Sequence, residues 1–272
     1  MRENMRIARE LALLRWSCHY EGPSVTLLRI VSRIAARIGW DVTSSDAFQR
    51  LVERSFDRRF GVETAGYTPP DQLPVTSEQA AEAVAYSATS SAKFGYLLAR
   101  LPIEFERSTF IDIGCGKGRV LFMASEFPFR RVLGVDFAAN LVEAAVANSS
   151  HFQSRRQRCR DITAVCADAT EFTFPDEPLV VYFYNPFSAV ILRPVLERLC
   201  RSLDASPRPT WIIYYNPVEA ALFNEFPSFV PYDREDCVDP RWRVYRWESP
   251  VKQSHGATKD SDVAATAMEF PA

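Results

Sequence analysis

The sequence has few histidines, no paired cysteines and no long apolar run. Its 272 residues include 3 histidines and 6 scattered cysteines, with no C-x-x-C pair. This pattern fits neither a disulfide framework nor a zinc site, so we predict reduced thiols and no metal. No stretch approaches the roughly 18 uninterrupted apolar residues of a membrane span, and charged residues interrupt the N-terminus where a signal peptide is apolar. We therefore expect a cytoplasmic protein.

The chain also lacks a large excess of charge of either sign. It carries 32 Lys and Arg against 34 Asp and Glu, which gives a formal net charge of −2. This balance argues against a dedicated nucleic-acid-binding protein. The first 60 residues differ, because 11 arginines stand against 7 acids there, 11 − 7 = +4. A local basic surface is therefore expected near the N-terminus.

Residues 1–60 are predicted to form a helical N-terminal extension. Within residues 25–40, apolar residues recur at helical spacing, and three arginines stand four residues apart. Such a helix can lie on an anionic membrane surface. It can also pack on its own domain with the arginines in solvent, and we favour this second interpretation because aromatic anchors are few. A peripheral membrane contact through this helix is the alternative.

After a turn-rich connector, strands and helices alternate. The strands are expected at 109–113, 131–136, 162–166, 179–184 and 210–215, and the helices at 77 onward, 90–100, 118–126, 139–149, 189–203 and 218–225. Apolar strands in this alternation predict an α/β fold whose parallel sheet carries helices on both faces. The stretches "FVPYD" and "WRVYRWE" predict an antiparallel hairpin that completes the sheet. We expect this domain at 61–250 and a disordered tail at 251–272.

A glycine-rich stretch, "FIDIGCGKGRV" at 110–120, follows the first strand. Its glycines at 114, 116 and 118 fit neither the G-x-x-x-x-G-K-[ST] pattern of a triphosphate site nor the G-x-G-x-x-G pattern of a dinucleotide site. S-adenosylmethionine is the third candidate, and its methionine end carries an ammonium and a sulfonium. Asp112 would repel a pyrophosphate but suits an ammonium. The charge of Asp112 therefore favours the ligand without phosphate.

Two further acids follow the next two strands. Asp136 ends the second strand, where a carboxylate can accept hydrogen bonds from both hydroxyls of a ribose. Asp168 follows the third strand, and its carboxylate or the Ala169 amide can meet the adenine edge. Each aspartate alone could also be a helix cap or a turn residue. Their placement after three successive strands favours one shared ligand, because ligands of open α/β sheets bind beyond the carboxyl ends of the strands.

These stretches resemble known motifs. "FIDIGCGKGRV", "VLGVD" and "VCADATEF" are similar to three motifs of the class I S-adenosylmethionine-dependent methyltransferases, and the resemblance covers roughly 86–247. "FDRRFGVETAG", "FYNPF" and "IIYYNP" resemble a bacterial methyltransferase-domain family whose substrates are unsettled. That family commonly has Y-x-P-T before the first strand, where this chain has "YSAT", with Ala88 in place of proline.

The resemblance implies a Rossmann-like seven-stranded sheet and S-adenosylmethionine as the cofactor. It also implies that Tyr86 and Thr89 cover the methionine end of that cofactor. The residues expected to contact the cofactor are Tyr86, Thr89, Asp112, Gly114, Cys115, Gly116, Gly118, Asp136, Phe137, Asp168, Ala169 and Asn185.

The fourth strand ends in "YNPF", which resembles the [DNS]-P-P-[YFW] motif of amino-group methyltransferases although one proline is missing. The resemblance implies that the Asn185 oxygen accepts a hydrogen bond from the target amine and that Phe187 forms a wall of its pocket. A second Asn-Pro turn at Asn216 is better explained as a strand terminator, because proline cannot continue a ladder. We expect methyl transfer to a nitrogen, on a protein lysine or another amine. A nucleic-acid methyltransferase and a non-catalytic S-adenosylmethionine-binding scaffold are the alternatives.

Overall fold

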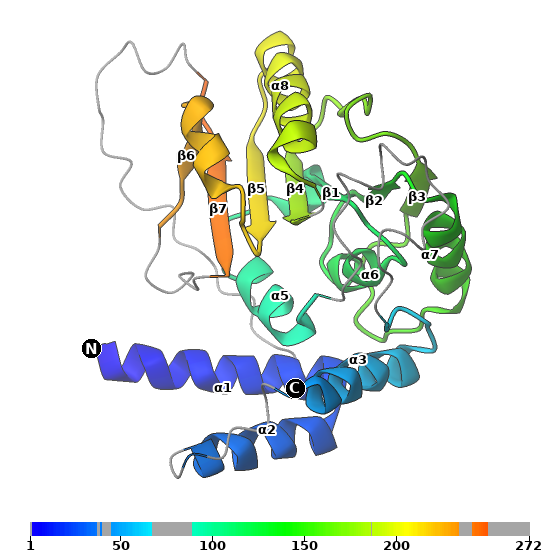
Figure 1. The fold of residues 1–272 in the computed structure, drawn as a ribbon, viewed down its shortest axis with the longest axis vertical. Coiled ribbons are helices and arrows are strands. Elements are labelled where there is room, and N and C mark those ends of the chain that lie inside the picture. The colour runs from blue at the N-terminus through cyan, green and yellow to red at the C-terminus, as the bar shows by residue number, and fades with distance from the viewer. Residues whose placement is uncertain are drawn as a thin grey trace.

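The chain folds around one seven-stranded sheet. The computed structural model describes residues 2–36, 39, 45–66, 89–185, 187–233 and 241–249, with side chains described from residue 7 onward. The strand order is β3-β2-β1-β4-β5-β7-β6 (Figure 1). The strands are β1 (Thr109–Ile113), β2 (Arg131–Asp136), β3 (Ile162–Cys166), β4 (Leu179–Tyr184), β5 (Thr210–Tyr215), β6 (Phe229–Pro231) and β7 (Trp242–Trp247).

The pairing directions confirm the predicted mixed sheet. Strands β1 to β5 pair in parallel, whereas β7 pairs antiparallel with both β5 and β6. The central strands β1 and β5 are buried at every residue, which explains their unbroken apolar runs. The edge strand β3 is only partly buried. The five parallel strands bring their carboxyl ends to one edge of the sheet.

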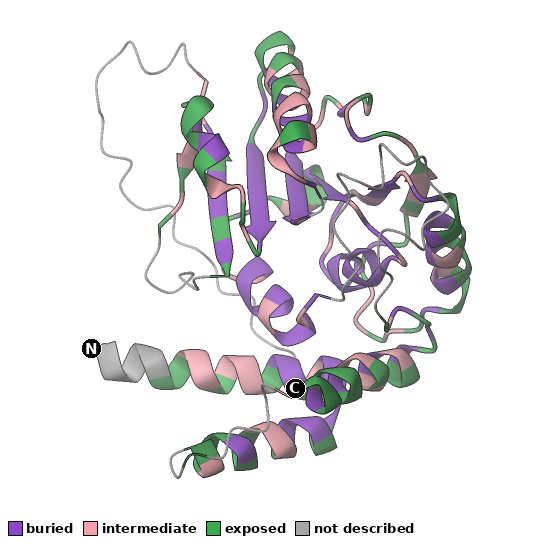
Figure 2. Ribbon diagram, viewed as in Figure 1, coloured by how far each residue is buried: buried purple, intermediate pink, exposed green. Residues whose placement is uncertain are grey.

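Helices cover both faces of the sheet. Val180 and Tyr182 point to the face that is covered by α5 (Ser91–Leu98) and α6 (Arg119–Ser125). Val181 and Phe183 point to the other face, which is covered by α8 (Ala189–Ala205). This alternation follows from the two-residue period of a strand. Figure 2 shows the central strands β4 and β5 buried along nearly their whole length.

Most predicted element boundaries agree with the structure. The helix expected at 139–149 is α7 (Ala139–His151), and the helix expected at 90–100 is α5. The helix expected at 218–225 is instead a 3-10 helix at Ala220–Glu225. The helix expected from residue 77 and the tail at 251–272 lie outside the described residues.

The N-terminal part of the chain forms the helices α1 (Arg2–Glu21), α2 (Pro23–Ala35) and α3 (Asp46–Phe60). Trp16, Tyr20, Phe56 and Phe60 of α1 and α3 belong to the same apolar cluster as residues of α5 and the sheet. Helix α2 is the outermost of the three and lies on the far side of α1 from the sheet (Figure 1). None of the helices within the described residues is both long and apolar enough to cross a membrane.

The packing of α2 differs from the favoured expectation. Its apolar residues were expected to face the domain and its arginines to face solvent. Instead Leu27 and Ile34 are exposed, while Arg29 forms an ion pair with Glu21 of α1. The acids on α1 explain the difference, because they hold the arginine side of α2 inward.

Candidate functional site

The glycine-rich loop joins β1 to α6 at the carboxyl-end edge of the sheet. Gly114, Gly116 and Gly118 have φ values of 82°, 51° and 87°, in the left-handed region that side chains other than glycine rarely adopt. The backbone amides of Gly114 and Cys115 both donate to the Val135 carbonyl, at 2.8 and 3.1 Å. The loop is therefore held against the end of β2 in a conformation that requires glycine.

Asp136 closes this loop from the β2 side. One carboxylate oxygen accepts from the Gly116 amide and the other from the Ala138 amide, each at 2.9 Å. Burial raises the pKa of Asp136, and hydrogen bonds from Ala138, Gly116 and Phe137 amides act in the opposite direction. Each oxygen retains acceptor capacity beyond these bonds. The carboxylate is thus oriented by backbone donors and can accept further hydrogen bonds.

Asp112 lies beside Asp136 but has no comparable support. Its side chain is buried, with 2% of the residue exposed. Burial raises its pKa well above the usual range, and the nearby Asp136 charge raises it further. Within the described ranges, no hydrogen-bond donor contacts its carboxylate. Burial close to a second carboxylate makes Asp112 costly to ionise, so this position favours a cationic ligand.

The remaining glycine of this region, Gly134 on β2, allows the loop to approach the strand. A Cβ atom at Gly134 would lie 2.7 Å from the Cys115 sulfur and 2.7 Å from a Leu121 methyl carbon. Burial raises the pKa of the Cys115 thiol, and the two aspartates raise it further. Cys115 is therefore a protonated packing residue whose sulfur faces β2. Sequence reasoning overlooked Gly134, although "VLGVD" displays it.

Of the two residues expected to cover the methionine end, one is described. The Thr89 hydroxyl shares a 2.9 Å hydrogen bond with the buried Tyr182 hydroxyl. Tyr182 on β4 is directly opposite Asp112 in the β1–β4 register. Thr89 therefore lies near Asp112. Tyr86 lies outside the described residues.

The residues after β2 and β3 take different environments. The Asp168 carboxylate is exposed and accepts from the Thr170 amide and hydroxyl, at 2.8 and 2.7 Å. This is an Asx turn, the alternative that was left open for Asp168. Ala169 is buried in the apolar cluster on the α8 face, and Phe137 packs against Ala138 and Leu141 of α7.

Asn185 follows β4 directly and is held in a strained, oriented state. Its φ is 40°, and only 8% of the residue is exposed. The Tyr214 hydroxyl donates to the Asn185 side-chain oxygen at 3.1 Å and accepts from the Glu219 amide at 3.2 Å. Burial raises the pKa of Tyr214 to about 12, so this hydroxyl remains a donor at neutral pH. Phe187 is also buried beside this turn.

The second Asn-Pro turn shares the backbone of the first but not its surroundings. Asn216 has a φ of 49°, yet its side chain is exposed. Its backbone amide donates to the Arg241 carbonyl at 2.7 Å. Asn216 therefore lies at the end of β5 with its side chain in solvent, as expected of a residue whose role is to end the strand.

Residues 53–65, which we call the strap, contact the glycine loop and the first residue of α6. Arg119, the first residue of α6, is buried and donates to the Thr64 hydroxyl at 2.7 Å, the Glu53 carbonyl at 2.9 Å and the Asp57 carboxylate at 3.0 Å. Its guanidinium also lies over the Phe56 ring, 4.6 Å from the centroid. The motifs "FDRRFGVETAG" and "GCGKGRV" thus meet through an ion pair between the buried Arg119 and the partly buried Asp57.

The same strap reaches the loop at two further points. Asn148 of α7 exchanges hydrogen bonds with the Glu63 backbone and donates to the Lys117 carbonyl at 3.1 Å. The Lys117 ammonium donates to the Ala65 carbonyl at 3.3 Å. Sequence reasoning missed these contacts, because the partners lie 31 to 85 residues apart. The glycine loop is therefore clamped between β2 and the strap.

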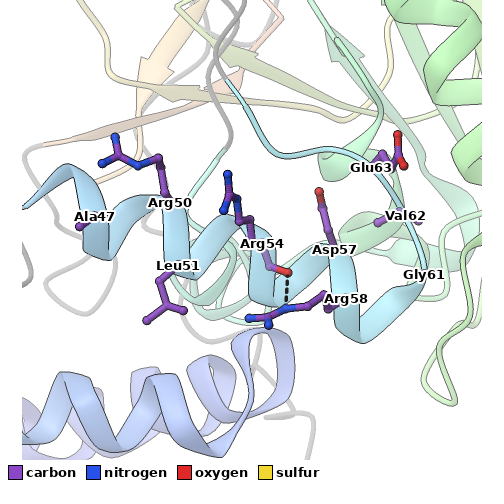
Figure 3. A pocket seen from close by; sticks show the side chains of 9 residues that line it. All are labelled: Ala47, Arg50, Leu51, Arg54, Asp57, Arg58, Gly61, Val62 and Glu63. Atoms are coloured by element: carbon purple, nitrogen blue, oxygen red, sulfur yellow. Dashed lines mark hydrogen bonds between the residues drawn. The ribbon is translucent and has the colours of Figure 1, made fainter.

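An open groove of about 840 Å³ is lined by residues of α3 and of the segment that follows it (Figure 3). Arg50 and Arg54 extend to the same side as Asp57 and Glu63, whereas Leu51 extends to the opposite side (Figure 3). The groove lining carries cations and carboxylates together. Across the described part of the chain, no group of three or more His, Cys, Asp or Glu side chains is placed to hold a metal ion.

Comparison with known proteins agrees with this geometry. Residues 110–206 match the family model described as a methyltransferase domain. No curated protein matches the chain.

Several solved structures are similar at low identity. A ribosomal protein L11 methylase from Lactobacillus delbrueckii subsp. bulgaricus has 18% identity and a TM-score of 0.37, covering 52% of this chain and 68% of that chain. A predicted N6-adenine-specific DNA methylase from Listeria monocytogenes has 16% identity and a TM-score of 0.45, covering 61% of this chain and 53% of that chain, so this chain spans about half of its length. An RNA methyltransferase from Salinibacter ruber, in complex with S-adenosyl-L-homocysteine, has 19% identity and a TM-score of 0.34. The match covers 59% of this chain and 92% of that chain.

The domain match includes the strand, glycine loop and helix that form the candidate site, and the sheet has the seven strands and the antiparallel end that the class requires. Residues 110–206 are therefore a methyltransferase domain, and the sheet around them has the class I methyltransferase fold.

Proposed function

We propose that this methyltransferase transfers the methyl group of S-adenosylmethionine to a nitrogen atom, with a protein lysine or another amine as the acceptor. The observation that carries the proposal is Asn185, a buried amide at the carboxyl end of β4 whose oxygen is oriented by Tyr214. That oxygen accepts one hydrogen bond from Tyr214 and has a second lone pair for an amine N–H. Asn216, with the same backbone and an exposed side chain, serves as the internal contrast.

The residues around the glycine loop fit the cofactor. The carboxylate of Asp112 is buried close to that of Asp136, so an ammonium would offset the negative charge gathered there. The Asp136 carboxylate would accept hydrogen bonds from the ribose hydroxyls while its backbone donors hold it in place. Gly116 has no Cβ atom, so a ligand can approach its backbone closely.

S-adenosylmethionine supplies an activated methyl group on its sulfonium. In the transfer a carbon–nitrogen bond forms as the carbon–sulfur bond breaks, and the amine must reach the methyl group in its neutral form. The protein's part is to orient the amine and exclude water. The side-chain oxygen of Asn185 would accept a hydrogen bond from the N–H of the amine and so orient its nitrogen. The buried Phe187 would exclude water from the pocket.

A nucleic-acid acceptor is the second candidate, and the groove beside α3 is the observation that favours it. Arg50, Arg54 and Arg58 line this groove and could neutralise phosphates. Asp57 and Glu63 line the same groove and would oppose an anion. The amine acceptor is better supported for this reason.

The test uses purified protein with tritiated-methyl S-adenosylmethionine and fractionated cell extract. Label in protein or small amines, lost with Asn185→Ala and retained with Asn216→Ala, would support the proposal. Label that is removed by nuclease would instead identify a nucleic-acid acceptor. Cofactor binding with no label in any fraction would identify a non-catalytic scaffold.

A further inference from the structure

The outer face of α2 is apolar, which is unusual for the outermost helix of a protein. Leu27, Val31 and Ile34 are 61%, 51% and 62% exposed, and Ile30 is 36% exposed. They are three or four residues apart, so they form one stripe along the helix. Figure 2 shows α2 at the boundary of the molecule, away from the sheet. We call these four residues the α2 stripe.

The polar side of α2 is locked against α1, so the stripe cannot turn inward. Arg29 donates to both carboxylate oxygens of Glu21, at 2.8 and 3.0 Å. Arg33 pairs with Glu10, and the Thr26 hydroxyl donates to the Ser17 hydroxyl at 3.1 Å. Each bond joins α2 to α1. Rotation of α2 would break two ion pairs, and the outward direction of the stripe is therefore built into the helical layer.

The exposed charges of the same layer are nearly all positive. Among the described side chains of α1, α2 and α3, the exposed charged residues are six arginines and one acid: Arg15, Arg33, Arg50, Arg54, Arg58, Arg59 and Asp46. The other acids of these helices are buried or partly buried, and most of them form ion pairs. One of these acids, Glu10, has a side chain that is 41% exposed and is paired with Arg33. The layer therefore combines an aliphatic stripe with a positive field that extends over about 10 Å at ordinary ionic strength.

We propose that the helical layer docks on an anionic lipid surface, with the α2 stripe inserted at the boundary between headgroups and acyl chains. Aliphatic side chains on one helix face together with arginines in the same helical layer are the combination that interfacial binding uses. A nucleic acid would use the arginines but not the stripe. A second copy of the chain could cover the stripe, but two layers of the same positive charge would repel each other. The inference is independent of the methyl acceptor.

The test is flotation of the full-length protein with two kinds of vesicle, phosphatidylcholine alone and phosphatidylcholine with about a third of anionic phosphatidylglycerol. We expect binding to the anionic vesicles and at least tenfold weaker binding to the neutral ones. The variant Leu27→Gln/Ile34→Gln should lose at least tenfold in binding to the anionic vesicles. Both residues are exposed, so the circular dichroism spectrum and melting temperature should not change.

The matched control is Val146→Gln/Val190→Gln, which replaces two equally exposed apolar residues on α7 and α8. It should bind anionic vesicles like the parent protein. Equal loss in both double variants, or no binding of the parent protein at low salt, would overturn the proposal. A dimer in sedimentation velocity that dissociates only in Leu27→Gln/Ile34→Gln would overturn it in favour of a second copy as the occupant.

Discussion

The carboxyl-end edge of the sheet buries carboxylates, whereas the helical layer exposes aliphatic side chains. Asp112 and Asp136 are buried at the glycine loop, and Leu27 and Ile34 are exposed on α2. The usual distribution is reversed at both places, and both reversals carry a free-energy cost for the isolated chain. A ligand can offset each cost: a cation at the edge and an apolar, anionic surface at the layer.

The two regions also differ in how their unusual residues are held. At the edge, backbone amides orient Asp136 and a tyrosine hydroxyl orients Asn185. In the layer, ion pairs between α1 and α2 set the direction of the stripe. The Arg119–Asp57 pair links the regions. Positions that violate the usual pattern are therefore reinforced by specific polar contacts rather than by apolar packing alone.

Breaking the link between the two regions should have the largest effect. Asp57→Ala leaves the buried Arg119 guanidinium without its charged partner, and removing one member of a buried pair typically costs about 3–5 kcal/mol. We expect the free energy of unfolding in urea to fall by that amount. The control is Arg193→Ala, which breaks an exposed pair with Glu225 and should change stability little. A similar loss of unfolding free energy in both variants would show that the Arg119–Asp57 pair contributes no more than an exposed ion pair.

The two Asn-Pro turns provide the next comparison. Asn185→Ala should lower the rate of methyl transfer by about 100-fold, because the acceptor would lose its orienting partner. Cofactor affinity should not change. Asn216→Ala should leave the rate unchanged, because its side chain is exposed. Single-turnover assays with labelled cofactor measure both, and a normal rate in Asn185→Ala would remove this residue from the mechanism.

Calorimetry can separate the roles of the buried Asp136 and the exposed Asp168. Asp136→Ala should weaken S-adenosylmethionine binding by about 1–3 kcal/mol, the range of hydrogen bonds to charged groups. Asp168→Ala, at the exposed turn after β3, is the matched control. It should weaken S-adenosylmethionine binding less, because the Asp168 carboxylate is engaged mainly in its own turn. Unchanged affinity in Asp136→Ala would refute the ribose assignment.

The smallest predicted effect is the pH dependence of cofactor affinity through Asp112. Burial raises the pKa of Asp112 in the free protein, and a cationic ligand would favour its ionised form. Cofactor affinity should therefore be full above this raised pKa and fall by up to about tenfold per pH unit as the pH drops through it. Asp112→Asn should bind more weakly at neutral pH and lose this acidic dependence in calorimetry. An unaltered pH profile in Asp112→Asn would mean that another group titrates.

Stability should respond to pH in the opposite sense at this residue. Because the pKa of Asp112 is raised in the folded state, the folded protein binds its proton more tightly than the unfolded chain does. The ionised residue therefore lowers stability as the pH rises from the ordinary aspartate range through the raised pKa. Ligand binding and protein stability thus make opposing demands on the same carboxylate.

Much of the sheet could be predicted from the sequence. The bounds of the five parallel strands agree with the structure, because a strand buried on both faces must be a short unbroken apolar run. The glycine loop was also recognisable, since Gly114, Gly116 and Gly118 all need positive φ. The seven-stranded sheet is confirmed, whereas the roles of the site residues and the domain boundaries stay predictions.

Contacts between distant segments were not predictable in this way. The spacing of Leu27 and Ile34 identifies a stripe, but it does not say which side of α2 faces the protein. That was decided by Glu10 and Glu21 on α1, which attract the arginines. Likewise, nothing near Arg119 in the sequence points to Asp57, which is 62 residues away.

The sequence by itself determined the strand pattern, the backbone conformation of the loop and the presence of acids after β1 and β2, because these depend on residue type and local periodicity. Only the tertiary structure decided that Asn185 is buried while Asn216 is exposed, and that the α2 stripe points outward. The physical reason is that burial and ion pairing depend on contacts between side chains that are far apart in the sequence, and local periodicity does not specify those contacts.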